Sequence, residues 1–279
     1  MKEVVTMWKN TRMIILVALS AAIYAAFLIV FKGGIPIVPG ITEVRPANVF
    51  PPVFSLLFGP AGAWGSAIGN LIGDLFGGTL GIGSIFGFVG NFFLGFIPYK
   101  MWGSVFGLVG KDDMSPTTNS GKKLAAFEIV ALTASAACGI IIAWYLDLAS
   151  IVPFAFLSVT ITVNNFAAAF ILGPILLALL YPRVKRWGLI WTDIMDPEDV
   201  SAGKARNLGT ILMIVGSLGG LIVGILVAAG LAGQTLYGFT GSSGQAAVWA
   251  SVLPFLILIV IASFMLSGRE QFVAEEDED

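Results

Sequence analysis

Long apolar segments alternate with short polar or glycine- and proline-rich segments along the whole chain. A helix needs about 20 apolar residues to cross the roughly 30 Å hydrocarbon core of a bilayer. The pattern predicts eight transmembrane helices, at about Met13–Phe31, Ala47–Phe58, Ala61–Phe76, Ser84–Trp102, Leu124–Leu146, Val152–Tyr181, Leu208–Leu231 and Ala246–Leu266. The second segment is short and contains two prolines, so the sequence FGPAG after it fits either a full turn or a re-entrant tip.

The basic residues are distributed unevenly between the two sides that these spans define. Of the 15 lysines and arginines, all but Lys32 and Arg45 fall on the side that carries both termini. Because cytoplasmic loops carry an excess of lysine and arginine, the sequence predicts a multi-pass protein of the plasma membrane with both termini in the cytoplasm.

The segments outside the spans suggest a domain organisation. In RVKRWGLIWTDIM, the residues Trp187, Ile190, Trp191 and Ile194 recur at helical spacing beside basic residues, which predicts a helix lying in the membrane interface. We therefore expect a six-helix membrane domain (1–182), an interfacial linker (183–207), a two-helix extension (208–267) and a solvated acidic tail (268–279).

Composition supports an all-α integral membrane protein and excludes several chemistries. Hydrophobic residues make up 57% of the chain and charged residues 11%, against roughly 25% charged in soluble domains. The chain has no histidine and a single cysteine, Cys138, which excludes disulfide frameworks, Cys/His metal sites and Ser-His or Cys-His catalysis. We therefore expect no catalytic residue, metal or cofactor, and the net charge of −2 offers no basic surface for nucleic acid.

The stretch GSAIGNLIGDLFGG in the third span combines glycine with polar residues. Glycines recur in the third and fourth spans at Gly65, Gly69, Gly73, Gly77, Gly83, Gly87 and Gly95. Such stripes let membrane helices approach closely, so we expect the third and fourth spans to pack tightly against each other.

A second stripe in the third span is polar and contains Ser66, Asn70 and Asp74. A carboxylate facing lipid at mid-depth costs at least about 2.5 kcal/mol. We therefore expect Asp74 to face a cavity in the bundle, the alternative being an ion pair with Arg45 or Lys32. Asn164 and Asn165 lie near the middle of the sixth span. They fit interhelical hydrogen bonds and cavity lining equally well.

These polar groups predict an outward-facing pocket for a small molecule. The predicted binding residues are Glu43, Arg45, Asn70, Asp74, Asn91 and Asn164. The loop KGGIPIVPGITEVRP, rich in glycine and proline, fits a lid over this pocket. The charged residues on the outer side have both signs, Lys32 and Arg45 against Glu43, Asp74 and Asp147, which favours a neutral or zwitterionic ligand over a polyanion.

The sequence EVRPANVFPPVFSLLFGPAGAWGSAIGNLIGDLFGG, with FVGNFFLGFIPYKMWG after it, resembles the substrate-binding S components of energy-coupling-factor (ECF) transporters. The resemblance covers about Met7–Tyr181 and implies six helices, an outer lid, and a vitamin or vitamin precursor as substrate. It also implies three partner chains, a coupling membrane subunit and two ATPase subunits. In this family, small residues spaced by four on the first helix dock on the coupling subunit, which here implicates Ala18, Ala22 and Ala26, widened by Ala21 and Ala25. The last two spans depart from the six-helix pattern.

Two other functions compete with this one. A stand-alone secondary transporter or channel would favour an ion-coupling acid at mid-membrane and inverted repeats, and no clear repeat is visible in the sequence. An intramembrane enzyme would lack the usual acid–base partner. The chain has no G-x-x-x-x-G-K-[ST] phosphate loop, so energy for uphill transport would come from another subunit.

Overall fold

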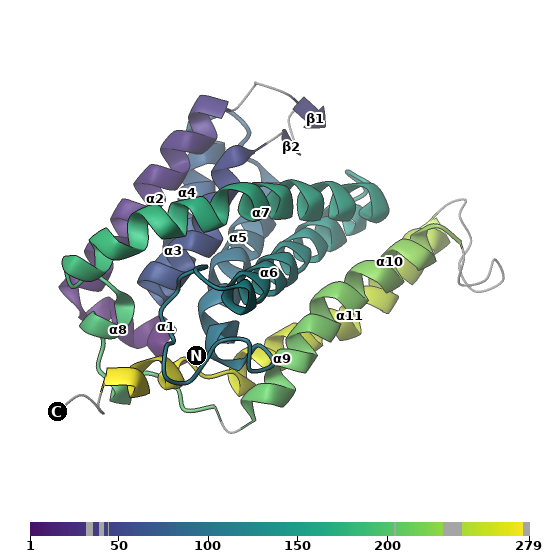
Figure 1. Ribbon diagram of the computed structural model, residues 1–279. Coiled ribbons are helices and arrows are strands. Elements are labelled where there is room, and N and C mark those ends of the chain that lie inside the picture. The colour runs from purple at the N-terminus through teal and green to yellow at the C-terminus, as the bar shows by residue number, and fades with distance from the viewer. Residues whose placement is uncertain (32–35, 39–41, 44, 204, 231–241, 276–279) are drawn as a thin grey trace.

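The computed structural model describes residues 1–31, 36–38, 42–43, 45–203, 205–230 and 242–275, in which the regular elements are helices and one short β-hairpin joined by turns and loops (Figure 1). The main elements are α1 (Glu3–Thr6), α2 (Thr11–Phe31), β1 (Pro36–Val38), β2 (Thr42–Glu43), α3 (Phe50–Phe58), α4 (Pro60–Phe76), α5 (Ile82–Met101), α6 (Gly121–Leu148), α7 (Phe154–Arg186), α8 (Trp191–Ile194), α9 (Arg206–Ile214), α10 (Gly220–Ala228) and α11 (Ser242–Met265). The predicted all-α membrane fold is confirmed.

Six helical segments in the described part of the chain are long and apolar enough to cross a membrane. They are Thr11–Phe31, Ile82–Ser104, Gly121–Leu148, Phe154–Ile194, Arg206–Ala228 and Ala246–Phe272. The other two predicted spans correspond to α3 and α4, which have 9 and 17 residues. At 1.5 Å per residue they extend about 14 and 26 Å, so the count of eight full spans is not confirmed.

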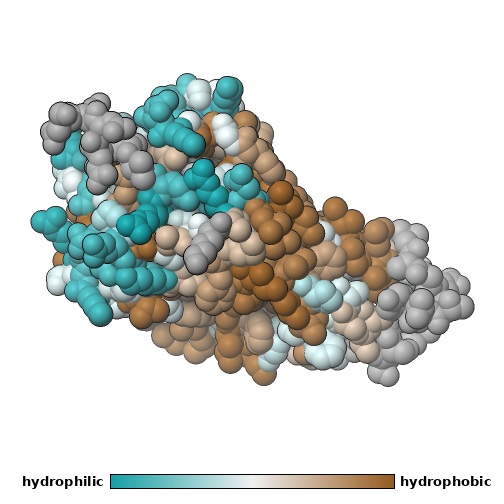
Figure 2. All heavy atoms as spheres, turned by 90° about the horizontal axis from the view of Figure 1, so that it is seen from below, coloured by the Kyte–Doolittle hydropathy of each residue, from teal (hydrophilic) through white to brown (hydrophobic). Residues whose placement is uncertain are grey.

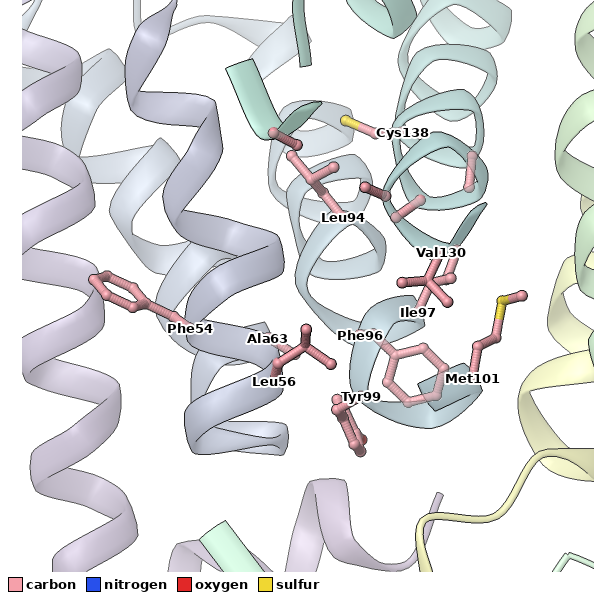
Figure 3. Close-up of a cluster of buried hydrophobic side chains, with 14 of the residues drawn as sticks. Phe54, Leu56, Ala63, Leu94, Phe96, Ile97, Tyr99, Met101, Val130 and Cys138 are labelled. Carbon is pink, nitrogen blue, oxygen red and sulfur yellow. The ribbon is translucent and has the colours of Figure 1, made fainter. Parts of the chain in front are cut away.

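Helices α2 to α7 form one bundle, in which α2 packs on α4, α4 on α5, α5 on α6 and α6 on α7. The core at one end is aromatic, with Phe96 and Tyr99 of α5 near Leu56 of α3 (Figure 3). Cys138 of α6 lies farther along the same core, beyond Leu94 (Figure 3). All nine residues of α3 are buried, which is why a helix too short to span can hold its place in the bundle.

Gly59 is the single residue between α3 and α4, so the sequence FGPAG forms a tight turn between two helices. Its φ of +55° lies in the left-handed region that glycine adopts at little cost. A Cβ at this position would also lie 2.6 Å from ring carbons of Trp191. The junction is therefore a tight single-residue link that requires glycine for its conformation and for its packing.

The prediction of an interfacial helix after the sixth span is wrong. Helix α7 continues to Arg186, Gly188 adopts a φ of +60°, and only the four-residue α8 follows. Trp191 is fully buried, and its ring lies 5.6 Å from that of Tyr99 and 5.1 Å from that of Phe272. The turn at Gly188 directs the chain back to the bundle, where burial of the Trp191 ring outweighs the interfacial pattern.

The start of the predicted solvated tail is also packed on the bundle. Residues Arg269–Glu275 form the short helix η6, and Gln271 donates a hydrogen bond of 2.6 Å from Nε2 to the Tyr99 carbonyl oxygen. Residues 276–279, with most of the acidic run, lie outside the described residues, as does Lys32 of the predicted lid. The solvated tail therefore remains a prediction for those last residues.

The glycine stripe of α4 packs against a different helix from the one expected. A Cβ on Gly65 would lie 2.4 Å from Ser20 Cβ, and one on Gly69 would lie 2.9 Å from the Ala21 carbonyl oxygen. Both neighbours belong to α2. The close packing expected between α4 and α5 is present, but Gly87 and Gly95 of α5 provide it, since a Cβ on Gly95 would lie 2.9 Å from Ala63 Cα.

The two C-terminal spans form a pair that packs on α6 and α7. Helices α9 and α10 are joined by the π-helical segment η5 (Val215–Gly219), and α11 runs beside them (Figure 1). Trp144 of α6 stacks on Trp249 at 5.7 Å and donates a 3.0 Å hydrogen bond from Nε1 to its carbonyl oxygen. A Cβ on Gly224 would lie 2.3 Å from the Phe154 ring, so close glycine contacts fix the extension to the bundle.

Helices α1 and α8 and the segment η6 all lie at one end of the bundle, and the β-hairpin lies at the other (Figure 1). Seen from the first end, hydrophilic residues gather over part of the face, and hydrophobic surface covers the flank toward the C-terminal helices (Figure 2). This distribution is typical of a protein that crosses a bilayer along the bundle axis. The cytoplasmic orientation of the termini remains a prediction.

Candidate functional site

A cavity of about 210 Å³ lies at the end of the bundle away from α1 and α8. It is lined by Arg45, Asn48, Asn70, Asp74, Thr79, Gly81, Gly83, Ser84, Gly87, Asn91, Cys138, Ile142, Leu146, Ile151, Ile161, Asn164 and Asn165. Its volume is below the roughly 300–1,000 Å³ typical of pockets for drug-sized ligands. The cavity therefore suits a compact molecule, and its wall contains both polar and aliphatic groups.

Five of the six predicted binding residues line this one cavity, although they come from four separate segments of the chain. Asn70 and Asp74 lie on α4, Asn91 on α5, Asn164 on α7, and Arg45 precedes the short helix η2 (Pro46–Val49). The sixth, Glu43, belongs to β2, and its side chain lies outside the described residues. The convergence is observed, and a role in binding remains a proposal.

Asp74 lies near the C-terminal end of α4, with a donor group near each carboxylate oxygen. Asn70 Nδ2 donates to Asp74 Oδ2 at 3.3 Å, and Thr79 Oγ1 donates to Asp74 Oδ1 at 3.3 Å. Asn70 is one helical turn before Asp74, and Thr79 follows the end of the helix, where its backbone N–H donates to the Asp74 carbonyl oxygen at 2.9 Å. The sequence around the helix end therefore positions this carboxylate.

Gly87 lets α5 approach this polar pair. A Cβ at Gly87 would lie 3.0 Å from Asn70 Nδ2 and 3.9 Å from Asp74 Oδ2. The first of these distances is tighter than about nine in ten real Cβ contacts, so the Asn70 amide would have to move. A methyl group there would displace the Asn70 amide and, through their hydrogen bond, the Asp74 carboxylate.

Gly87→Ala should therefore weaken ligand binding by about tenfold, equivalent to ~1.4 kcal/mol, with little loss of thermal stability. Gly121→Ala is the matched control, because it makes the same change in a helix where the new Cβ meets no atom within 4 Å. Titration of purified protein measures both affinities. Equal affinities for the two variants would show that the Gly87 contact does not position the site.

A chain of amide side chains joined by one tyrosine lies deeper in the bundle. The Tyr24 hydroxyl oxygen lies 2.8 Å from Asn48 Oδ1 and 2.9 Å from Asn91 Oδ1. Asn48 Nδ2 donates to Asn165 Oδ1 at 2.5 Å, and Asn91 Nδ2 donates to the Gly87 carbonyl oxygen at 2.8 Å. A phenol carries one proton, so Tyr24 donates to one of the two carbonyl oxygens at a time. This series of hydrogen bonds connects α2, η2, α5 and α7 around the cavity.

Sequence reasoning missed several polar groups of the cavity and left one choice open. Asn48, Thr79 and Ser84 were not predicted, because each lies at a helix end, where polar residues are also common as caps. Asn164 and Asn165 turn out to serve both purposes. They line the cavity, and Asn164 Oδ1 also accepts a 3.1 Å hydrogen bond from the Arg45 backbone N–H.

Residues 14–182 of the chain match the QueT transporter family. The match covers more than half of the chain and includes every residue that lines the cavity. The chain belongs to the QueT transporter family. No curated protein sequence and no solved structure showed significant similarity to the chain.

The QueT family consists of ECF S components associated with queuosine precursors. The resemblance found in the sequence is thereby confirmed, and the matched region ends at the boundary expected for the six-helix domain. QueT proteins are multi-pass membrane transport proteins and not a class of enzyme. The C-terminal extension lies outside the matched region.

Proposed function

We propose that this QueT protein captures a queuosine precursor from outside the cell and delivers it as the S component of an ECF importer. The supporting observation is the convergence of five predicted polar residues on one cavity within the region that matches the family. A coupling membrane subunit and two ATPase subunits complete the proposed complex. They supply the energy, because the chain itself has no phosphate-binding loop.

The chemistry of the cavity suits the heterocycle of such a precursor. Queuosine precursors share a 7-deazaguanine ring, a flat and compact molecule with N–H donors and a carbonyl acceptor on its edge. Carboxamide side chains present a donor and an acceptor side by side, and paired contacts of this kind recognise base edges. Arg45 and Asp74 add one charge of each sign to the wall, which fits a neutral polar ligand.

The proposed docking surface for the coupling subunit is the strip of Ala18, Ala22 and Ala26 on α2. All three are exposed, as a contact surface requires. The expected widening of the strip by Ala21 and Ala25 is wrong, because both are 3% exposed and face inward. The glycines of α4 occupy that inner face, as the approach of Gly69 to Ala21 shows.

Asp74→Ala should lower the affinity for 7-deazaguanine by about tenfold or more, since hydrogen bonds to charged groups contribute about 1.5–3 kcal/mol each. Isothermal titration of detergent-solubilised protein measures the loss, and size-exclusion chromatography checks the fold. Asp193→Ala, at the opposite end of the bundle, is the control and should bind as the wild type does. Unchanged binding by Asp74→Ala would remove Asp74 from the site and leave it as an ion-pair partner of the lid.

A further inference from the structure

Asp74 is the one carboxylate, among the described residues, that lines the cavity, and Arg45 is the one cation. The remaining polar lining consists of carboxamides, hydroxyls and the Cys138 thiol. A carboxylate differs from all of these in one respect that matters for recognition. It accepts hydrogen bonds at both oxygens and donates none, whereas a carboxamide accepts at one atom and donates at the other.

The edge of a guanine-type ring offers the complementary pattern. Its N1–H and its 2-amino group are adjacent donors that point in the same direction, and they can form two parallel hydrogen bonds with the two oxygens of one carboxylate. A ring with a 2-oxo group offers a donor beside an acceptor, which matches a carboxamide instead. A ring without a substituent at position 2 offers a single donor.

We propose that Asp74 is the specificity-determining residue of this site, and that it selects rings carrying a 2-amino group by accepting from N1–H and the amino group together. This inference rests on the proposed function, because it takes a 7-deazaguanine ring as the ligand. It goes further in assigning one edge of the ring to one side chain. The rest of the cavity then contacts the other edges of the ring.

The surroundings of Asp74 orient its carboxylate for this role. Asn70 Nδ2 and Thr79 Oγ1 lie 3.3 Å from different oxygens of the carboxylate, one on each side. Gly87 leaves room for the arrangement on the side of α5. Rigid support of this kind is what a selective contact requires.

The donor at Asn70 Nδ2 also fixes the orientation of that amide. Turning the Asn70 side chain over would place its carbonyl oxygen against the carboxylate, which is repulsive. Asn70 Oδ1 is buried and has no hydrogen-bond partner among the described residues. A buried acceptor without a partner costs about 1–3 kcal/mol, so the structure keeps the amide in an unfavourable state in order to hold its N–H groups toward Asp74.

The test compares three rings that differ at position 2: 7-deazaguanine with an amino group, 7-deazaxanthine with an oxo group, and 7-deazahypoxanthine with hydrogen. Wild-type protein should bind 7-deazaguanine about tenfold or more tightly than either of the others, as expected for one lost bidentate contact. Asp74→Asn should reverse the order of the first two rings. Its carboxamide can accept from N1–H and donate to the 2-oxo group.

The outcomes separate the inference from the proposed function. If wild-type protein binds none of the three rings, the proposed function fails. If it binds 7-deazaguanine and 7-deazahypoxanthine equally, the function stands and the assignment of Asp74 fails, and this measurement needs no variant. A folded Asp74→Asn protein that loses affinity for all rings without the reversal also overturns the assignment, since a residue serving only as a partner of Arg45 would behave in that way.

Discussion

Ala22→Trp should abolish energised uptake while leaving ligand binding to the isolated protein intact. Ala22 is the middle residue of the exposed strip on α2, between Ala18 and Ala26. Helices in lipid associate through close packing of small residues, because no hydrophobic drive acts between them. An indole group on the strip would hold the coupling subunit away, whereas the cavity is built mainly from other helices.

The measurement pairs uptake of radiolabelled 7-deazaguanine in cells that contain the complete importer with titration of the purified chain. Ile222→Trp is the control, because Ile222 is 56% exposed on α10 of the extension. Lost uptake with intact binding for Ala22→Trp alone supports docking through the strip. Joint loss of both properties would mean that Ala22 packs within this protein, and loss of uptake for Ile222→Trp alone would move the contact to the extension.

The second large effect is expected for Glu3→Gln, which should destabilise the fold by about 3–5 kcal/mol. Glu3 Oε1 and Lys100 Nζ lie 2.6 Å apart, and both side chains are fully buried. Ser201 donates to Glu3 Oε2 from its backbone N–H at 3.1 Å and from its hydroxyl at 2.9 Å. The pair thus joins α1, the end of α5 and the segment before α9, and removing one charge leaves the other buried without compensation.

Thermal unfolding of solubilised protein measures the effect against Asp193→Asn. The pair of Asp193 and Lys185 is 3.2 Å apart but partly exposed, and exposed pairs contribute only about 0–1 kcal/mol. The double variant Glu3→Leu with Lys100→Met should recover most of the lost stability, because it removes both fully buried charges. The N-terminal ammonium group, which lies 3.3 Å from Glu3 Oε2 in the wild type, is partly exposed and can be solvated. A Glu3→Gln protein as stable as Asp193→Asn would contradict the interpretation.

The same pair predicts how stability depends on pH. Burial by itself raises the pKa of Glu3. The attraction of Lys100 and of the N-terminal amino group, together with hydrogen bonds to the carboxylate, outweighs burial and lowers the pKa from 4.5 to about 2. A depressed pKa in the folded state stabilises the fold above the unfolded value. Wild-type protein should therefore lose stability between about pH 4.5 and 2, and Glu3→Gln should lose less over the same interval.

Hydrophobic length predicted where the long helices lie, and small-residue spacing predicted that some of them pack closely. Neither pattern could predict which helix packs on which, or which aromatic side chain is buried. Glycines every four residues predicted a close contact for α4, but a spacing does not name the partner, and α2 fills that role. Trp187 and Trp191 have the same residue type and similar surroundings in the sequence. Only the fold, through the turn at Gly188, leaves the first 66% exposed and buries the second.

The sequence could predict that the polar residues inside the spans lie together, because a polar group facing lipid in the membrane interior is costly. Their role as cavity lining followed from that cost, and five of the six meet at one cavity. Asp147 shows the limit of the approach, because an aspartate at the end of a predicted span is also typical of a solvated helix end. It is 8% exposed, and Oδ1 accepts a 2.9 Å hydrogen bond from the Phe154 backbone N–H at the start of α7.

The extension lies on the flank of the bundle opposite α2 (Figure 1). Its helices enlarge the area that the chain occupies in the plane of the membrane, and they do so without covering the alanine strip. A coupling subunit bound at α2 would therefore have the extension at the outer margin of the complex, surrounded by lipid. Fluorophores attached to exposed positions of α10 would report movements of the chain during transport without lying in the cavity or on the alanine strip.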